Sequence, residues 1–188
     1  DIASVTVPRV FARSNGQGFR TTSYALDQQL TTVSPTAEST TLSILMDRPH
    51  TLAVGAVRQY EVALDQGAIR ALSSITAPTI AGDDYWYDSG SQVTAVLNGI
   101  WGRSSGKGES LIAFAINGGS ETDVATSGTV VALSVSISSP QAITTQVVEQ
   151  FELIQASGSL VSVTQSSIPG DTGWYDSGTQ VEAVYDYS

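Results

Sequence analysis

The sequence of 188 residues contains no cysteine. Disulfide bonds, thiolate metal sites, iron–sulfur clusters and cysteine nucleophiles are therefore excluded together. Charged residues are also scarce, at 14% of the chain, whereas soluble domains average about 25%. A surface made mainly of Ser, Thr, Gln and Gly is typical of secreted, fibrous or wall-associated proteins. Such a protein must gain its durability from buried sheets, bound metal ions or neighbouring subunits.

Membrane spans, glycosylation acceptors and basic stripes are missing too. No stretch approaches the roughly 20 apolar residues of a membrane span, so we expect none. Every asparagine precedes a glycine, which leaves no Asn-x-Ser/Thr acceptor for N-glycosylation. The net charge is −10, and no basic residue follows Lys107. The sequence thus lacks the basic stripe with interleaved aromatics that predicts nucleic acid binding.

The charge is unevenly distributed along the chain. Arg9, Arg13 and Arg20 make the first residues basic, whereas residues 108–188 contain acidic residues and no basic one. A basic head and an acidic tail can attract each other between molecules. The sequence opens on Asp1 rather than Met, which favours a secreted product after signal-peptide removal; an arbitrary chain boundary gives the same start.

The chain contains an internal repeat. Residues 86–90 and 174–178 both read WYDSG, and VRQYEV at 57–62 matches VEQFEL at 148–153. The two offsets, 88 and 91 residues, differ by one three-residue insertion or deletion. We therefore predict two copies of one unit, at about 38–102 and 129–188.

Both copies show the patterns of short strands. Apolar residues alternate with polar ones, and prolines or Asp-Ser-Gly turns separate the runs. The predicted fold class is all-β, with two related immunoglobulin-like or jelly-roll-like β-sandwich units and an extended N-terminal strand. Only residues 23–30 have a helical pattern. The WYDSG motif fits a buried aromatic plug followed by a tight turn; a sugar-stacking platform is the functional alternative.

QYEV at 59–62, followed by WYDSGSQV at 86–93, resembles a β-sandwich repeat of archaeal secreted and cell-surface proteins. In that repeat a GWYxxGxxV strand closes a small domain. The size, the start and the lack of cysteine also resemble archaeal extracellular filament subunits, namely threads, bundling pili and cannulae. This resemblance implies a homopolymer built by donor-strand complementation. The missing N-glycosylation acceptor is a departure, since one group of these threads is heavily N-glycosylated.

The second copy lacks one strand of the first. Residues 110–116, SLIAFAI, carry apolar side chains on both faces, as a buried strand does. The sequence ends before an equivalent strand follows the second WYDSG motif. We therefore divide the chain into an N-terminal strand and linker (1–20), a first unit with an additional strand (21–128) and a strand-deficient second unit (129–188).

The N-terminal strand is the candidate that fills this gap in another molecule, by β-augmentation. Residues 1–11 form a pattern of extended strand that Pro8 ends, and a glycine-containing link follows. The predicted donor residues are Ile2, Ala3, Ser4, Val5, Thr6, Val7 and Arg9. The predicted acceptor region contains Val181, Ala183, Tyr185 and Tyr187. Arg9 and Arg13 would then face the acidic second unit. Pairing within one molecule and a frayed N-terminus are the alternatives.

Carboxylates gather near both WYDSG motifs. They are Asp83, Asp84 and Asp88 in the first copy and Asp171 and Asp176 in the second. Oxygen ligands in a turn suit Ca²⁺, and a bound ion would offset acidic repulsion between subunits. Solvated turn aspartates are the simpler interpretation, because the spacing is not that of an EF-hand. Calcium is the one cofactor that the sequence suggests.

No catalytic constellation stands out. The single histidine, His50, is Gln141 in the second copy, and no nucleophile elbow or phosphate-binding glycine loop accompanies it. We predict a non-enzymatic structural subunit of an extracellular filament or sheath, whose partners are copies of itself. The alternative is a monomeric cell-surface binding module that recognises sugars through Trp86, Trp101 and Trp174. A hydrolase is a third option and would need a pocket that gathers polar groups.

Overall fold

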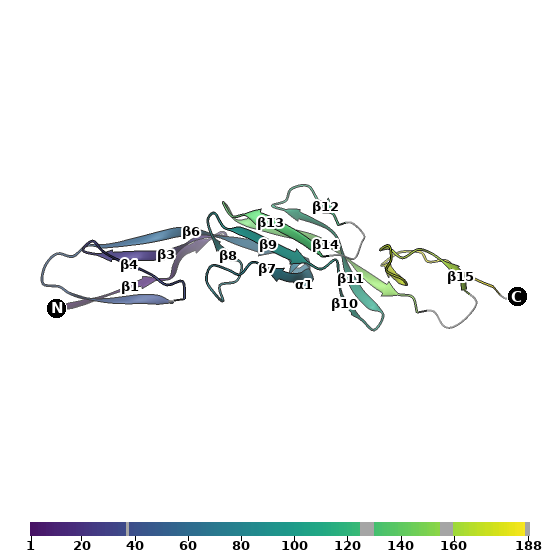
Figure 1. Ribbon diagram of the computed structural model, residues 1–188, viewed down its shortest axis with the longest axis horizontal. Coiled ribbons are helices and arrows are strands. Elements are labelled where there is room, and N and C mark those ends of the chain that lie inside the picture. Colours follow the sequence, from purple (N-terminus) through teal and green to yellow (C-terminus); the bar gives the residue numbers. More distant parts are fainter. Residues whose placement is uncertain (37, 125–129, 155–159, 187–188) are drawn as a thin grey trace. The chain divides into compact units, whose positions relative to one another are not determined.

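The computed structural model describes residues 1–36, 38–124, 130–154 and 160–186. Strands dominate these ranges, and one short helix accompanies them (Figure 1). The elements are β1 (Ile2–Pro8), β2 (Val10–Ser14), β3 (Gln17–Leu26), β4 (Gln29–Thr32), β5 (Ser39–Leu45), β6 (Leu52–Leu64), α1 (Gln66–Ala71), β7 (Leu72–Ile75), β8 (Trp86–Asp88), β9 (Gln92–Leu97), β10 (Ile100–Ser104), β11 (Lys107–Ile116), β12 (Thr122–Asp123), β13 (Val131–Ser136), β14 (Gln141–Glu152), β15 (Leu160–Val163), β16 (Trp174–Asp176) and β17 (Ala183–Tyr185). The predicted all-β, sandwich-like fold is therefore confirmed.

Contacts divide the chain into two compact units. Unit 1 consists of Asp1–Ala63, Thr76–Val93 and Ser134–Gln141, and unit 2 of Leu64–Ile75, Thr94–Leu133 and Ala142–Ser188. The units therefore interleave in sequence, whereas the sequence analysis placed one boundary at residue 128.

Each unit is built on a hairpin that pairs with a long strand. In unit 1, β2 and β3 form the hairpin, β6 pairs with β3, and β4 and β8 extend the sheet. In unit 2, β10 and β11 form the hairpin, β14 pairs with β11, and β12 and β16 extend the sheet. All of these pairings are antiparallel.

The two hairpins share a sequence signature, RSNGQG at 13–18 and RSSGKG at 103–108. The central turn residues have positive φ, 51° and 72° at Asn15 and Gly16 and 51° and 75° at Ser105 and Gly106. This is the type I′ geometry favoured in two-residue hairpins. Residues 110–116, which the sequence analysis assigned to the first unit, thus lie in β11 and pair with β14. Their counterparts in unit 1 lie in β3, which pairs with β6 in the same way.

Another two-residue turn, at Asp27 and Gln28, joins β3 to β4. Its φ values are 50° and 70°, and Leu26 pairs with Gln29 across it. Residues 23–30 therefore form a β-hairpin, although their sequence had a helical pattern. The cross-strand partners of β3, which lie in β6, override that local pattern.

The tyrosine of each WYDSG motif lies in the core of its unit. Tyr87 is 1% exposed and Tyr175 is 4% exposed. Their hydroxyls donate to the carbonyls of Thr76 and Thr164, both at 2.7 Å. Burial raises the pKa of Tyr87 to about 12. The interpretation of the motif as a buried aromatic plug is confirmed for the tyrosines, whereas Trp86 and Trp174 are only half-buried.

Helix α1 follows Asp65, a helix start that the sequence analysis did not mark. The Asp65 carboxylate accepts the backbone N–H of Ala68 at 2.7 Å, as an N-cap does. It also accepts the Thr145 N–H at 2.7 Å and the Thr145 hydroxyl at 2.9 Å, which fixes the helix to β14. Within the described ranges, no helix has the length and apolarity that a membrane crossing needs.

Candidate assembly interface

Strand β1 pairs with β5 of its own chain, antiparallel, over the whole length of β1. Backbone hydrogen bonds continue this pairing beyond both ends. The Met46 N–H donates to the Asp1 carbonyl at 2.8 Å, and the Arg9 N–H donates to the Glu38 carbonyl at 3.1 Å. We call β1 and β5 the N-terminal sheet. Pairing within one molecule, which the sequence left open as an alternative, is thus present on one edge of β1.

The other edge of β1 has no strand on it in the part of the chain that the structure describes. In an antiparallel pair, consecutive residues direct their backbone groups to opposite sides. Asp1 and Arg9 bond towards β5, so the N–H groups of Ser4 and Thr6 point towards the bare edge. Pro8 has no N–H to contribute there.

Strands β15 and β17 form a second two-stranded sheet, the C-terminal sheet. Among the described residues, three residue pairs join these strands, a bulge interrupts their register, and hydrogen bonds between Thr164 and Glu182 continue the contact. Several large apolar side chains on and before these strands are exposed. They are Leu153 (38%), Ile154 (77%), Val161 (66%), Val184 (44%) and Tyr185 (41%).

Strand β9, in contrast, lies between two neighbours in the sheet β13-β9-β7 (Figure 1). On the β13 side, the Ile137 N–H donates to the Ser91 carbonyl at 2.9 Å. On the β7 side, the Asn98 N–H donates to the Ala71 carbonyl at 2.7 Å. The side chains of one β9 face are buried: Val93 is 0% exposed, Ala95 1% and Leu97 0%.

Strands β1, β9 and β17 occupy equivalent positions in the repeat, although residues 2–8 and 92–98 share no identical residue. Residues 2–8 (IASVTVP), 92–98 (QVTAVLN) and 180–186 (QVEAVYD) align at offsets of 90 and 88. At the offsets of the repeat, β5 corresponds to β13 and β7 corresponds to β15. Among the described residues, β9 pairs with both β13 and β7. Strand β1 pairs only with β5, the counterpart of β13, and β17 pairs only with β15, the counterpart of β7. Each terminal sheet therefore contains the strand that the other lacks.

Two apolar positions beside the terminal sheets are more exposed than their equivalents beside β9. Tyr185 corresponds to Leu97, and its exposed fraction is 41% against 0%. Met46 corresponds to Ile137, and its exposed fraction is 48% against 0%. Tyr185 and Met46 are thus open to solvent where Leu97 and Ile137 are buried, whereas Val7, the equivalent of Leu97 in β1, is buried at 4% exposed.

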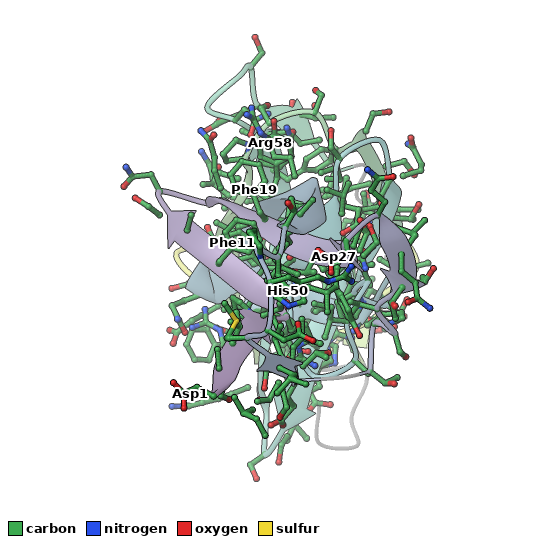
Figure 2. The ribbon with its side chains drawn as sticks, turned by 90° about the vertical axis from the view of Figure 1, so that its left-hand side faces the viewer. Asp1, Phe11, Phe19, Asp27, His50 and Arg58 are labelled. Carbon is green, nitrogen blue, oxygen red and sulfur yellow. The ribbon has the colours of Figure 1, made fainter. Side chains whose placement is uncertain are left out.

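An apolar groove of about 320 Å³ runs beside β1, in unit 1. Its lining includes Val5, Val7, Phe11, Leu52 and Val54. Phe11 stacks on Phe19 with ring centroids 5.5 Å apart, and the Arg58 guanidinium lies 5.5 Å from the Phe19 ring (Figure 2).

The equivalent position in unit 2 is covered. Leu52 and Val54 correspond to Ile143 and Thr145, and Asp65 at the start of α1 bonds to Thr145. Ile143 is 1% exposed where Leu52 is half-buried, and Thr145 is half-buried where Val54 is 46% exposed. The groove of unit 1 is therefore the site that, in unit 2, the start of α1 covers.

The residues predicted as donor and acceptor lie at these sheets. Residues 2–7 all belong to β1, and Arg9 follows the strand. Ala183 and Tyr185 lie in β17, Val181 precedes it, and Tyr187 lies outside the described residues. Arg13 was expected to face the acidic second unit, but it binds Asp83 within unit 1.

Arg13 is the centre of a clamp in unit 1. Its guanidinium binds both carboxylate oxygens of Asp83, donates to Gln59 at 2.7 Å, and stacks on Trp86 at 4.1 Å. The equivalent clamp in unit 2 consists of Arg103, Asp171, Gln150 and Trp174. Sequence reasoning gave Arg13 a different role and did not single out Arg103, although the repeated RSxGxG signature contains both.

The aspartates predicted as calcium ligands are mostly engaged by protein groups. Asp83 and Asp171 belong to the two clamps, and Arg20 binds Asp88 at 2.5 and 3.1 Å. Asp176 accepts the Gln150 amide at 2.9 Å, and Asp84 is exposed. Across the described ranges, no three His, Asp or Glu side chains are grouped as metal ligands. The guanidinium groups supply the positive charge that a cation would otherwise supply.

The three tryptophans also have protein partners. Arg13 covers one face of Trp86, and Arg103 covers one face of Trp174. The indole N–H of Trp101 donates to Glu109 Oε2 at 2.6 Å. These contacts fix the rings within their units.

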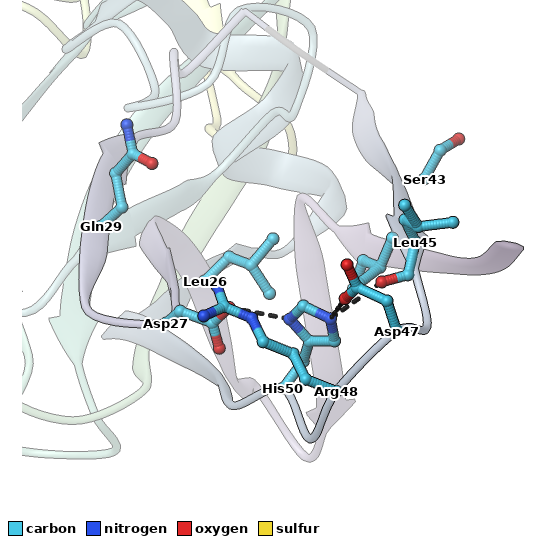
Figure 3. Close-up of a pocket in the computed structure, with 9 residues that line it drawn as sticks. Leu26, Asp27, Gln29, Ser43, Leu45, Asp47, Arg48 and His50 are labelled. Carbon is cyan, nitrogen blue, oxygen red and sulfur yellow. Dashed lines mark hydrogen bonds and ion pairs between the residues drawn. The ribbon is translucent and has the colours of Figure 1, made fainter.

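His50 and Asp27 line an open hollow of about 610 Å³ (Figure 3). His50 Nδ1 lies 2.7 Å from Asp27 Oδ2, and Nε2 lies 2.9 Å from the Leu45 carbonyl oxygen. Both ring nitrogens thus face acceptors, which favours the imidazolium form. The hydrogen bond to Asp27 raises the pKa of His50. The hydrogen bond from the Thr51 N–H lowers the pKa of Asp27, and the hydrogen bond with His50 lowers it further.

The same turn contact is neutral in unit 2. Asp27 Oδ1 accepts the Thr51 N–H at 2.9 Å, and Asn117 Oδ1 accepts the Ala142 N–H at 2.7 Å in the equivalent place. His50 itself corresponds to Gln141. The pair of His50 and Asp27 is thus a charged form of a repeated turn contact, and it ties the end of β5 to the β3–β4 turn.

Comparison with known proteins adds no relative to this description. No protein-family model matches the sequence, and neither curated proteins nor solved structures give a significant match.

Proposed function

We propose that this protein is a structural subunit of an extracellular filament or sheath, which joins head to tail with copies of itself through its N-terminal strand. One observation carries the proposal. Three strands occupy equivalent positions, and within the described residues β9 has two neighbouring strands whereas β1 and β17 have one each.

The exposed surface at both terminal sheets supports association. Ile2 is 72% exposed and Met46 is 48% exposed at the N-terminal sheet, and Val161 is 66% exposed at the C-terminal sheet. Burying apolar surface contributes about 25 cal/mol per Å². Bare strand edges also offer backbone groups that a second copy can pair.

The two complementary surfaces are different, so the contact is heterologous. A heterologous contact generates an open filament unless the rotation between subunits closes a ring. Charge favours the same arrangement, because Arg9 follows β1 whereas Glu182 and Asp186 flank β17. A mechanical role at the cell surface agrees with the low content of charged residues.

A monomeric binding module is the second candidate, and the hollow beside His50 is the observation that favours it. Aromatic stacking of sugars has less support, since arginines already cover one face of Trp86 and Trp174. Self-association in the absence of any ligand separates the two candidates.

The test compares the wild-type chain with Thr6→Pro and Thr6→Val by negative-stain electron microscopy. The proline removes an N–H that points to the bare edge of β1, while the β5 side of the strand keeps its bonds. We expect filaments from the wild-type chain and from Thr6→Val, and few or none from Thr6→Pro. A wild-type chain that remains monomeric at all concentrations would contradict the proposal.

A further inference from the structure

We propose that the contact between subunits forms by strand exchange: β1 of one molecule, still paired with its own β5, replaces β17 on β15 of a second molecule. This inference rests on the proposed function and adds the strand that leaves and the register that results. The template is the sheet β13-β9-β7, in which one strand of this kind is held on both edges.

Strand β17 is the weaker of the two strands that compete for β15. Among the described residues, β17 has three residue pairs with β15 and a bulge, whereas β1 pairs with β5 along its whole length. Tyr185 of β17 is 41% exposed, whereas Val7, the equivalent residue of β1, is 4% exposed. The exchange therefore gives up few contacts on β15 and keeps the N-terminal sheet intact.

The offsets between the copies define the register of the exchanged strand. Ala95 of β9 pairs with Ile75, and Ala183 of β17 pairs with Val163 in the same way. The corresponding residue of β1 is Val5, which would lie opposite Val163 of the second molecule. Likewise, Ser162 pairs with Val184 now and would pair with Thr6 after exchange.

The backbone groups of β1 match this role. The Glu182 carbonyl of β17 accepts the Thr164 N–H at 2.9 Å. The corresponding residue of β1 is Ser4, whose backbone groups point to the bare edge. Pro8 replaces Asn98 of β9, whose N–H bonds to Ala71, so the exchanged strand would make one bond fewer at that end.

The groove beside β1 gives the second molecule a place to dock. In unit 2, the start of α1, which leads into β7, covers Thr145, the equivalent of Val54. Since β15 is the counterpart of β7, we expect its pairing with β1 to place apolar side chains such as Val161 near the groove beside β1. Val54, now 46% exposed, should then become buried.

Engineered disulfides test the exchange, because the chain has no cysteine of its own. Val163→Cys with Ala183→Cys would lock β17 onto β15 within one molecule. Ser4→Cys with Ser43→Cys would lock β1 onto β5. Both are directly opposed pairs of the kind not joined by backbone hydrogen bonds, in which Cα atoms are about 4.5 Å apart, within the range for a disulfide.

We expect the first lock to abolish filaments and reduction to restore them, whereas the second lock should leave filament formation unchanged. Filaments that form with the β15–β17 lock fully oxidised would overturn the exchange and leave the proposed function standing. Loss of filaments with the β1–β5 lock alone would show that β1, rather than β17, leaves its partner, and would also overturn the inference. No filaments from the reduced proteins would overturn the proposed function, and the exchange with it.

A cross-link between molecules tests the register separately. Chains that carry Val5→Cys are mixed with chains that carry Val163→Cys, assembled and oxidised. We expect covalent dimers on a non-reducing gel, and far fewer when Val7→Cys replaces Val5→Cys, because that residue lies two positions away. Each single variant oxidised alone is the control for dimers of one kind. Equal yields from the Val5→Cys and Val7→Cys chains would overturn the register.

Discussion

Replacing Arg103 with Ala removes four contacts at once in unit 2. Two bonds to Asp171, one bond to Gln150 and the stack on Trp174 are lost together. Asp171 would keep its charge with only 18% of its side chain exposed. Gln150, whose exposed fraction is 0%, would lose the donor to its side-chain oxygen. The substitution thus leaves a carboxylate and an amide oxygen without their partner in a largely dry site.

The expected loss follows from the burial of the ion pair. Exposed ion pairs contribute about 0.2–1 kcal/mol, whereas breaking a buried pair costs about 3–5 kcal/mol. With 24% and 18% of their side chains exposed, Arg103 and Asp171 lie nearer the buried limit. Including the cation–π contact, we expect Arg103→Ala to lower the free energy of unfolding by about 3 kcal/mol. Arg103→Lys keeps the charge but not the two-pronged geometry, so its loss should be about half as large.

Urea unfolding followed by tryptophan fluorescence measures these losses. Arg13→Ala tests the equivalent clamp in unit 1 and should cost a similar amount. Arg48→Ala is the control, because the Arg48 side chain is 69% exposed and lies 3.4 Å from Asp27; we expect a loss of about 0.5 kcal/mol or less. A loss for Arg103→Ala no larger than that for Arg48→Ala would refute the clamp as a stabilising device.

Two further predictions concern local structure. Gly16→Ala should destabilise more than Gly106→Ala, although φ is positive at both, because the added methyl at Gly16 would lie 3.1 Å from Pro140 Cβ and the one at Gly106 meets nothing nearer than 4.0 Å. Equal shifts in the urea midpoint would contradict this. The contact of His50 with Asp27 should stabilise most between the ordinary pKa values of Asp, 3.8, and His, 6.5. Because the pKa of His50 is raised in the folded protein, the stabilisation is lost as the pH rises through the folded-state pKa of His50. Because the pKa of Asp27 is lowered, the stabilisation is also lost as the pH falls through the folded-state pKa of Asp27. Thermal unfolding from pH 3 to 9 should show this peak relative to Asp27→Asn/His50→Gln, which reproduces the residues of unit 2; parallel curves would contradict it.

The sequence predicted the features that depend on short-range patterns. Alternation and turn residues gave the all-β class, the extended run that ends at Pro8, and the buried tyrosine of the WYDSG motif. These features depend on side-chain periodicity and on backbone preferences of a few residues, which are legible in a single chain.

The boundaries of the repeated unit were harder to predict from the sequence. Residues 10–26 and 100–116 share the RSxGxG turn, but they differ at the flanking positions Phe19 and Glu109, and Arg20 and Ser110. Those side chains have different partners: Phe19 stacks on Phe11, whereas Glu109 accepts from Trp101. Long-range partners of this kind leave no local pattern, so the assignment of residues 110–116 to the first unit missed their pairing with β14.

Two-sided burial of residues 110–116 was also predicted too broadly. Leu111, Ala113 and Ala115 are buried, but Ile112 on the other face is 41% exposed. Apolar side chains on both faces of a strand show which faces can be covered, and the neighbouring elements decide which one is covered.

Electron microscopy of the full chain beside a chain that lacks residues 1–8 tests the proposed assembly most directly. Both proteins are concentrated without ligand under identical conditions, and circular dichroism checks that both remain folded. The proposal predicts filaments from the full chain and isolated particles from the shortened one. Filaments of the same kind from both proteins, or isolated particles from both, would contradict it.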